Sequence, residues 1–306
     1  MVVIESSTLA VTVLPEVGGK VGQILHKTLG CNLLIAPRKP YRTIPLHGDW
    51  LQYDTSGMDD CFPNIARGSY IQGVPAPVKL PDIGEWSHGK WEILSAARDH
   101  VMMQRPGVLL PYFAQKRVSL VNESTLEFAY SVENRGTSPL RYMWSAHPLI
   151  DVQNEYELVL PSGDLDFRVF PSDGEMHRWP DWNGLDLSQT WISKGMDLKI
   201  FVVGLTEGWC ELRCQSYTLR FTFDLSTTPV LGIWFNNFGF PAEGGAPFRC
   251  VAVEPCTSPS DLLDELDSTA YPVIPPGATA AWSLRLEVVP ATTGPADMLR
   301  PDMDRS

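Results

Sequence analysis

The sequence predicts an all-β protein, built as one large antiparallel β-sandwich with few short helices. Short stretches rich in Val, Leu, Ile, Thr and aromatic residues recur along the chain, and Gly, Pro or Asn separates them at intervals of about ten residues. Several stretches alternate apolar and polar residues, as a sheet with one buried face does. Because no sequence typical of an interdomain linker interrupts this pattern, we expect a single domain over residues 1–290.

Four segments show the alternation most clearly, and each is expected to form strands. In chain order they are residues 8–14, 118–132, 217–225 and 280–288. The second segment contains the turn sequence Asn122-Glu123-Ser124, so it is expected to form two strands. The fourth follows the turn sequence Pro275-Pro276-Gly277.

One helix is expected, beginning at Ser258. Ser258 can cap it, Pro259 suits the first helical position, and Asp261 stands three residues after the cap. Residues 291–306 have little apolar surface to bury, and we expect them to form a polar C-terminal tail.

The composition argues against several kinds of partner. The chain has 24 Lys and Arg against 36 Asp and Glu, a net charge of −12, which opposes binding to nucleic acid or to an anionic membrane. No apolar run approaches the roughly 18 residues that span a bilayer, and the first residues lack the basic region of a signal peptide. The six cysteines form no CxxC pair and are expected to be reduced thiols. These features predict a cytoplasmic protein.

Two residues are candidates for acid/base chemistry, since the motifs GxGxxG, GxxxxGK[ST], HExxH and GxSxG are absent. His147 lies in an apolar run from Trp144 to Ile150, and imidazole both accepts and donates protons near neutral pH. Glu254 ends the apolar run from Cys250, where burial would raise its pKa toward that of a general base. Considered alone, His147 could equally be a hydrogen-bonded core histidine, and Glu254 could equally be a solvated or ion-paired glutamate.

Further residues are candidates for ligand binding. His88 lies in a segment rich in Gly, Pro and Trp that suits a binding loop, and Trp234 stands beside polar residues, as sugar-stacking tryptophans do. The adjacent acids Asp59 and Asp60 are a weak metal signal, so no metal site is expected. They could instead pair with Arg67, which could also bind a hydroxyl group. Core packing and structural ion pairs are the alternative explanations.

Six segments, taken in order, resemble the aldose 1-epimerase (galactose mutarotase-like) superfamily over residues 8–289. The segment from Leu14 to Val21 resembles its opening strand and turn, and Pro276-Gly277 before Trp282 resembles its closing strand. Gly57–Arg67 resembles its sugar-binding arginine segment, and Leu80–Trp86 resembles its first histidine loop. Trp144–Leu149 resembles its catalytic histidine motif, and Val253–Thr257 resembles its catalytic glutamate motif.

The resemblance implies a β-sandwich whose concave face holds a hexose, or a modified or phosphorylated hexose, with no cofactor and no metal. It implies that Glu254 is the base and His147 the acid in a ring opening that interconverts α and β anomers, the two facing each other about one sugar ring apart across a cleft. It also implies that Arg67, His88 and Asp59 hold hydroxyl groups and that Trp234 packs on the sugar. Asp166 and Asp181 are further candidates for a hydroxyl-binding carboxylate.

One position departs from the pattern, because Ile83 stands where relatives carry a histidine in the first loop. His88 could replace that histidine from the same loop. The alternative function is a non-catalytic carbohydrate-binding or sugar-sensing protein on the same fold. A glycosidase would instead need two carboxylates about 5–10 Å apart. We expect a monomer or a homodimer that binds a small carbohydrate.

Overall fold

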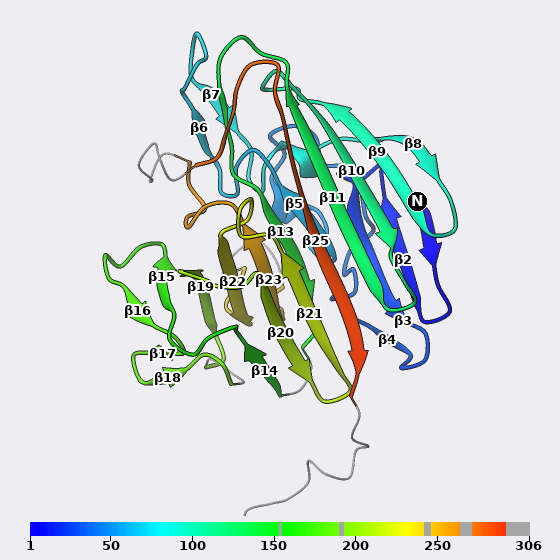
Figure 1. Ribbon diagram of the computed structural model, residues 1–306, viewed down its shortest axis with the longest axis vertical. Coiled ribbons are helices and arrows are strands. Elements are labelled where there is room, and N and C mark those ends of the chain that lie inside the picture. The colour runs from blue at the N-terminus through cyan, green and yellow to red at the C-terminus, as the bar shows by residue number, and fades with distance from the viewer. Residues whose placement is uncertain (153–154, 190–192, 242–245, 264–270, 292–306) are drawn as a thin grey trace, which may run out of the picture.

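The computed structural model of the chain describes residues 1–152, 155–189, 193–241, 246–263 and 271–291. Two large antiparallel sheets lie as layers, one in front of the other (Figure 1). The described residues contain no α-helix and only two short 3-10 helices, η1 (Trp50–Gln52) and η2 (Glu85–Ser87). No helix in this part of the chain could therefore cross a membrane. The all-β prediction is confirmed.

The larger sheet has eleven strands, and it carries most of the functional residues considered below. Its strands in spatial order are β1 (Val2–Glu5), β2 (Leu9–Leu14), β3 (Lys20–His26), β5 (Met58–Cys61), β13 (Ser145–Ile150), β23 (Arg249–Cys256), β22 (Val230–Asn237), β19 (Met196–Val203), β15 (Asp166–Phe170) and β16 (His177–Arg178), with β4 (Cys31–Asn32) paired to β3.

The second sheet has eight strands. In spatial order they are β14 (Tyr156–Val159), β20 (Trp209–Cys214), β21 (Tyr217–Phe223), β25 (Thr279–Pro290), β11 (Thr125–Asn134), β10 (Tyr112–Leu120), β9 (His100–Pro106) and β8 (Glu92–Ala96). Three two-stranded sheets complete the described fold: β6 (Gly68–Tyr70) with β7 (Val78–Leu80), β12 (Leu140–Arg141) with β24 (Val273–Ile274), and β17 (Asp181–Trp182) with β18 (Leu185–Asp186).

The main core is made by the alternating apolar residues of these strands. In β21 the residues Tyr217, Leu219, Phe221 and Phe223 are buried and those between them are more exposed, as the sequence pattern predicts. The other predicted strands are present as β2, β10 with β11, and β25. All six cysteines are free.

Buried ion pairs interrupt this apolar core. Lys116 on β10 is ion-paired with Asp60 on β5, so the contact joins the two sheets. The Lys116 Nζ also donates to the carbonyl of Gly19 at 2.9 Å, and the Tyr130 hydroxyl donates to Asp60 at 2.7 Å. Because every polar group of this cluster has a partner, the charges can be buried.

The helix expected from Ser258 does not begin there, since residues 258–263 form bends and a turn. The Leu262 amide donates to the Ser260 hydroxyl at 3.0 Å, and the Ala66 amide donates to the Asp261 carbonyl at 2.8 Å. The Leu262 amide and the Asp261 carbonyl would form backbone hydrogen bonds within a helix. Here the Ser260 side chain and the distant Ala66 amide bond them instead. Residues 264–270, and most of the expected tail at 292–306, lie outside the described residues.

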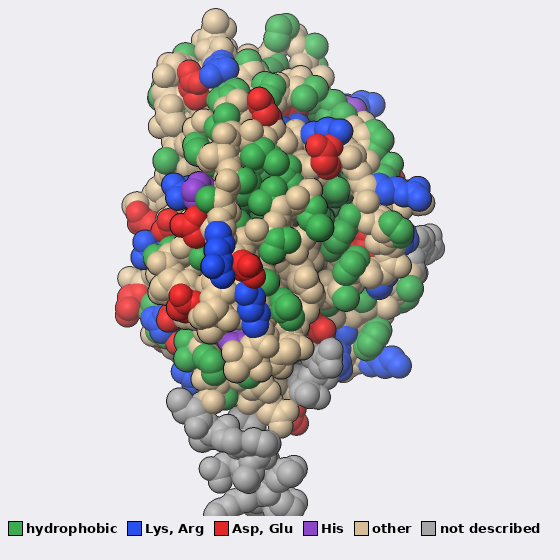
Figure 2. Space-filling model, turned by 90° about the vertical axis from the view of Figure 1, so that its right-hand side faces the viewer, with side chains coloured by type: hydrophobic (Ala, Val, Ile, Leu, Met, Phe, Trp, Pro, Cys, Tyr) green, Lys and Arg blue, Asp and Glu red, His purple; other side chains and the backbone are tan. Residues whose placement is uncertain are grey.

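The eight-stranded sheet ends at β8, all five residues of which are exposed. Figure 2 shows the side of the molecule that carries β8 and β9 at the right of Figure 1, where hydrophobic side chains gather among charged ones. Ile93 and Leu94 on β8 are among the exposed apolar side chains. An edge strand of this kind can pair with a second chain, and a monomer or homodimer remains a prediction.

Candidate functional site

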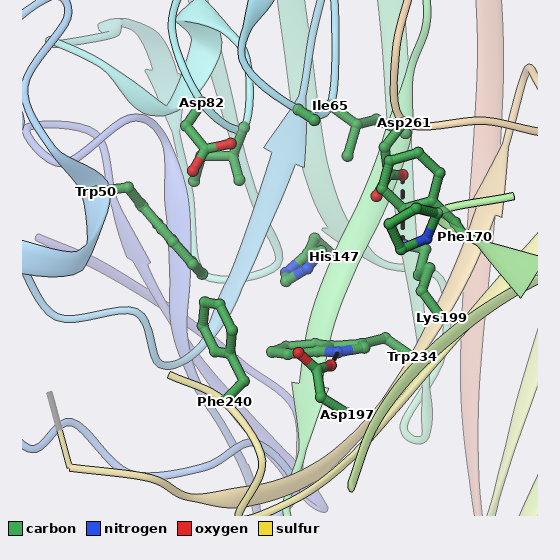
Figure 3. A pocket seen from close by; sticks show the side chains of 13 residues that line it. Trp50, Ile65, Asp82, His147, Phe170, Asp197, Lys199, Trp234, Phe240 and Asp261 are labelled. Carbon is green, nitrogen blue, oxygen red and sulfur yellow. Dashed lines mark hydrogen bonds and ion pairs between the residues drawn. The ribbon is translucent and has the colours of Figure 1, made fainter. Parts of the chain in front are cut away.

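A cavity of about 280 Å³ lies where side chains of β13, β19 and β22 meet several loops (Figure 3). With Phe170 of β15, four strands of the eleven-stranded sheet supply lining residues. The rest come from η1, from the segment before η2, and from the segments after β5, β15, β22 and β23. The lining residues are Trp50, Ile65, Ala66, Asp82, Ile83, His147, Phe170, Pro171, Asp197, Lys199, Trp234, Phe240 and Asp261.

Aromatic side chains form one part of the cavity wall. The ring centroids of Trp234 and Phe240 are 5.2 Å apart, and those of Trp50 and Phe240 are 6.3 Å apart. The Trp234 Nε1–H donates to Asp197 at 2.5 Å, which fixes the indole ring. Its centroid lies 5.6 Å from that of the His147 imidazole. An apolar ring face therefore lies next to a group that can transfer a proton.

Ionisable side chains form another part of the wall, and Glu254 lies behind them. Lys199 is ion-paired with the fully buried Glu254, and its Nζ lies 3.7 Å from Asp261 Oδ1. Glu254 Oε1 lies 3.8 Å from His147 Nε2, and the Ser145 hydroxyl donates to Glu254 Oε2 at 3.3 Å. These residues form one continuous cluster, which we call the Lys199 cluster: His147, Lys199, Glu254 and Asp261.

Burial shifts the pKa values in the Lys199 cluster in different directions. Burial, helped by the charge of Lys199, lowers the pKa of His147 to about 3, so its imidazole is neutral at neutral pH. Burial raises the pKa of Glu254, although Lys199 opposes this shift. Burial also raises the pKa of Asp261 to about 6. Burial alone would lower the pKa of Lys199, but Asp261 and Glu254 outweigh it and raise that pKa, so Lys199 is a cation.

Three buried atoms of the Lys199 cluster lack a hydrogen-bond partner among the described residues. They are His147 Nδ1, Glu254 Oε1 and Asp261 Oδ1. Buried polar atoms are normally hydrogen-bonded, so hydroxyl groups of a bound ligand would satisfy atoms that face the cavity. No group of three or more His, Cys, Asp or Glu side chains within the described ranges is arranged to hold a metal ion.

Comparison with solved structures adds a fold relationship. A candidate aldose 1-epimerase from Escherichia coli K12 superposes with a TM-score of 0.74 at 16% identity, over 95% of this chain and 99% of that one. A galactose mutarotase-like protein from Lactobacillus casei gives 0.69 at 16% identity, over 94% and 99%. The fold is that of the galactose mutarotase-like proteins. No family model matches the sequence, and no curated protein matches it.

Within this galactose mutarotase-like fold, the structure brings His147, Trp234 and Glu254 together. His147 and Trp234 line the cavity, whereas Glu254 lies behind His147 and Lys199 and is not part of the lining. The prediction that Glu254 and His147 face each other across a sugar ring is wrong. They lie on β23 and β13, which are paired, and adjacent strands are only about 4.8 Å apart, so the two side chains are neighbours.

The other three predicted binding residues do not line this cavity, and a sugar-binding role for them stays a prediction. Asp59 is buried in an ion pair with Lys20, at 2.8 Å. His88 is buried, with Nδ1 2.9 Å from the Gly84 carbonyl oxygen. Arg67 is exposed and lines a separate hollow.

The loop before η2 explains why His88 does not replace the missing histidine. Ile83 has a φ of 52° and Gly84 a φ of 71°, so the chain turns sharply at these two residues. This turn places Ile83 in the cavity wall and His88 outside it. An isoleucine with positive φ is a strained conformation of the kind found at functional sites. Its apolar side chain cannot bond a hydroxyl group.

Sequence reasoning missed four charged residues of the lining: Asp82, Asp197, Lys199 and Asp261. Asp197 and Lys199 stand two apart in a strand that is otherwise apolar, and that spacing places both side chains on one face. This was the signal that could have identified them. Asp166 and Asp181, considered as hydroxyl-binding carboxylates, are not in the lining; Asp166 pairs with Arg178 instead.

Proposed function

We propose that this protein binds an aldose in the Trp234 cavity and interconverts its α and β anomers by acid/base ring opening. One observation carries the proposal: His147, backed by the buried carboxylate of Glu254, lies in the wall of a cavity beside the face of Trp234. The cavity, about 280 Å³, is near the lower end of the small-ligand range of about 300–1,000 Å³, which suits a monosaccharide. The shared fold supports the same class of substrate.

The lining supplies a group for each of the two proton transfers. His147, which is neutral and a weak base because its pKa is about 3, takes the proton of the anomeric hydroxyl as the bond between C1 and the ring oxygen breaks. The carboxylate of Glu254, 3.8 Å from Nε2, offsets the charge of the resulting imidazolium. Asp261 is mostly ionised at pH 7, because its pKa is raised only to about 6, and its protonated minor fraction gives the proton to the ring oxygen. The open-chain aldehyde rotates about its C1–C2 bond, and closure with the two transfers reversed gives the other anomer.

This assignment differs from the one that the resemblance implied, in which Glu254 itself takes the proton. Glu254 is 0% exposed, and His147 and Lys199 separate it from the cavity. Glu254 is therefore a positioning residue here, and its effect on the substrate passes through His147.

Polarimetry on freshly dissolved α-D-glucose and α-D-galactose tests the proposal. We expect the protein to accelerate mutarotation, and His147→Asn to lower the rate by about 10²–10⁴. Glu254→Gln and Asp261→Asn should also lower it, whereas Asp181→Asn, an exposed acid outside the cavity, should not. If no aldose shows an accelerated rate, the proposed activity is wrong.

A non-catalytic sugar-binding protein is the second candidate. Two observations favour it: the apolar Ile83 in the wall, and the ion pair with Lys199 that engages Glu254. Such a protein would be stabilised against heat by sugars without accelerating mutarotation. The same polarimetry, combined with a thermal-shift measurement, distinguishes the two functions.

A further inference from the structure

We propose that the cavity selects among aldoses by charge: it excludes sugars that carry a phosphate or carboxylate group, and it binds an amino sugar more tightly than the neutral parent sugar. This inference rests on the proposed function, because it concerns the ligand of the same cavity. It narrows the substrate class beyond an aldose of unspecified charge.

The side chains around the cavity carry an excess of negative charge. Three carboxylates, Asp82, Asp197 and Asp261, line it, and Glu254 lies directly behind. In the described lining, Lys199 is the one Lys or Arg side chain. Four carboxylates thus surround a single ammonium group. An anionic sugar would enter a region that already carries excess negative charge.

The positive charge of Lys199 is already neutralised by neighbouring carboxylates, so it is not free to bind a phosphate. It is ion-paired with Glu254, and its Nζ lies 3.7 Å from Asp261. Its side chain is only 9% exposed, so a phosphate reaching it would have to lose its hydration while competing with two fixed carboxylates. Lys199 therefore neutralises the cluster and is unsuited to bind an anion.

The nearby side chains of Arg67 and Lys79 do not line the cavity. Arg67 and Lys79 line a separate hollow, together with His47. Burial raises the pKa of Asp82 and the charge of Arg67 opposes this, so Arg67 influences the cavity through Asp82 without lining it. The internal segments outside the description, residues 153–154, 190–192, 242–245 and 264–270, contain no Lys, Arg or His.

Aromatic rings and a carboxylate line the part of the cavity that a cationic group of a sugar would contact. Trp50, Phe240 and Trp234 surround its lower part in Figure 3, and Asp82 lies above Trp50. An ammonium group is attracted both to aromatic faces and to a carboxylate. An amino group thus finds favourable neighbours where a phosphate finds unfavourable ones.

A charge series measured by calorimetry at pH 7 and low salt tests the inference. The probes are D-glucosamine, D-glucose, N-acetyl-D-glucosamine as the uncharged control at the same carbon, D-glucuronate and D-glucose 6-phosphate; the corresponding galactose derivatives repeat the test. We expect glucosamine to bind at least about tenfold more tightly than glucose, and both anions at least about tenfold more weakly. Added salt should reduce these differences.

Two matched variants identify the source of the selectivity. Asp82→Asn should bring the affinity for glucosamine close to that for glucose, whereas Asp181→Asn, which removes an exposed acid outside the cavity, should leave the ratio unchanged. Tight binding of glucose 6-phosphate, or equal affinity for glucosamine and glucose, would overturn the inference and leave the proposed function standing. If no sugar binds, both fail together.

Discussion

Replacing Lys199 with methionine tests the charge arrangement of the site in detail. Methionine has a similar length and no charge, so the variant leaves the carboxylates of Glu254 and Asp261 without their cation. The Glu254 side chain is 0% exposed and that of Lys199 9% exposed. Removing one partner of such a buried pair costs about 3–5 kcal/mol. We expect Lys199→Met to lower the free energy of unfolding by that amount at pH 7.5.

The loss of stability should depend on pH in a defined direction. Burial raises the pKa of Glu254 above its ordinary value even with Lys199 present, and without Lys199 this pKa rises further. A carboxyl group with a raised pKa in the folded state destabilises the protein only above its pKa in the unfolded state, and the penalty is complete above the folded-state pKa. The deficit of the variant should therefore be small near pH 4.5 and grow toward pH 7.5.

Urea unfolding at pH 5.0 and pH 7.5, followed by both tryptophan fluorescence and circular dichroism, measures this deficit; coincident curves justify a two-state analysis. Lys194→Met, at an exposed lysine, is the control and should change stability by less than about 0.5 kcal/mol. A deficit below about 1 kcal/mol, or one equal at the two pH values, would refute the reasoning.

Three further predictions concern other parts of the molecule. Asp60→Ala leaves Lys116 as an unpaired charge between the sheets and should lower the free energy of unfolding in urea by about 3–5 kcal/mol. The double variant Asp60→Leu, Lys116→Met should recover much of that free energy, and full stability of the single variant would contradict the prediction. Gly84→Ala should lower stability by about 1–3 kcal/mol, because its Cβ would overlap the backbone N and O atoms of Phe62; an unchanged melting temperature would refute the tight packing. The His147 ring signals in NMR should show no titration between pH 5 and 8, since its pKa is about 3, and an inflection near 6.5 would contradict its buried, neutral state.

Local alternation was sufficient to predict the all-β class and the strands of four segments, and the resemblance of six segments predicted the fold. The pattern from Tyr217 to Leu225, for example, became β21 with the predicted buried face. His147 and Glu254 were also identifiable, since each is an ionisable group within a mostly apolar run, and Trp234 was identifiable because it stands near the polar residues Asn236 and Asn237.

Apart from Asp197 and Lys199, the rest of the site could not be predicted, because it depends on contacts between distant segments. Asp59 is adjacent to Asp60, yet the two acids pair with different lysines, Lys20 and Lys116, neither of them close in sequence. The sharp turn at Ile83 and Gly84 decides which residue of its loop faces the cavity. The Asp261 backbone, which would suit a helix start, instead accepts a hydrogen bond from Ala66.

The most direct test of the central claim is a crystal structure of the protein soaked with a neutral aldose or an amino sugar. We expect the sugar ring to pack on Trp234, with its anomeric oxygen within hydrogen-bond distance of His147 and its ring oxygen near Asp261. A sugar bound elsewhere, or bound with its anomeric carbon away from His147, would contradict the account.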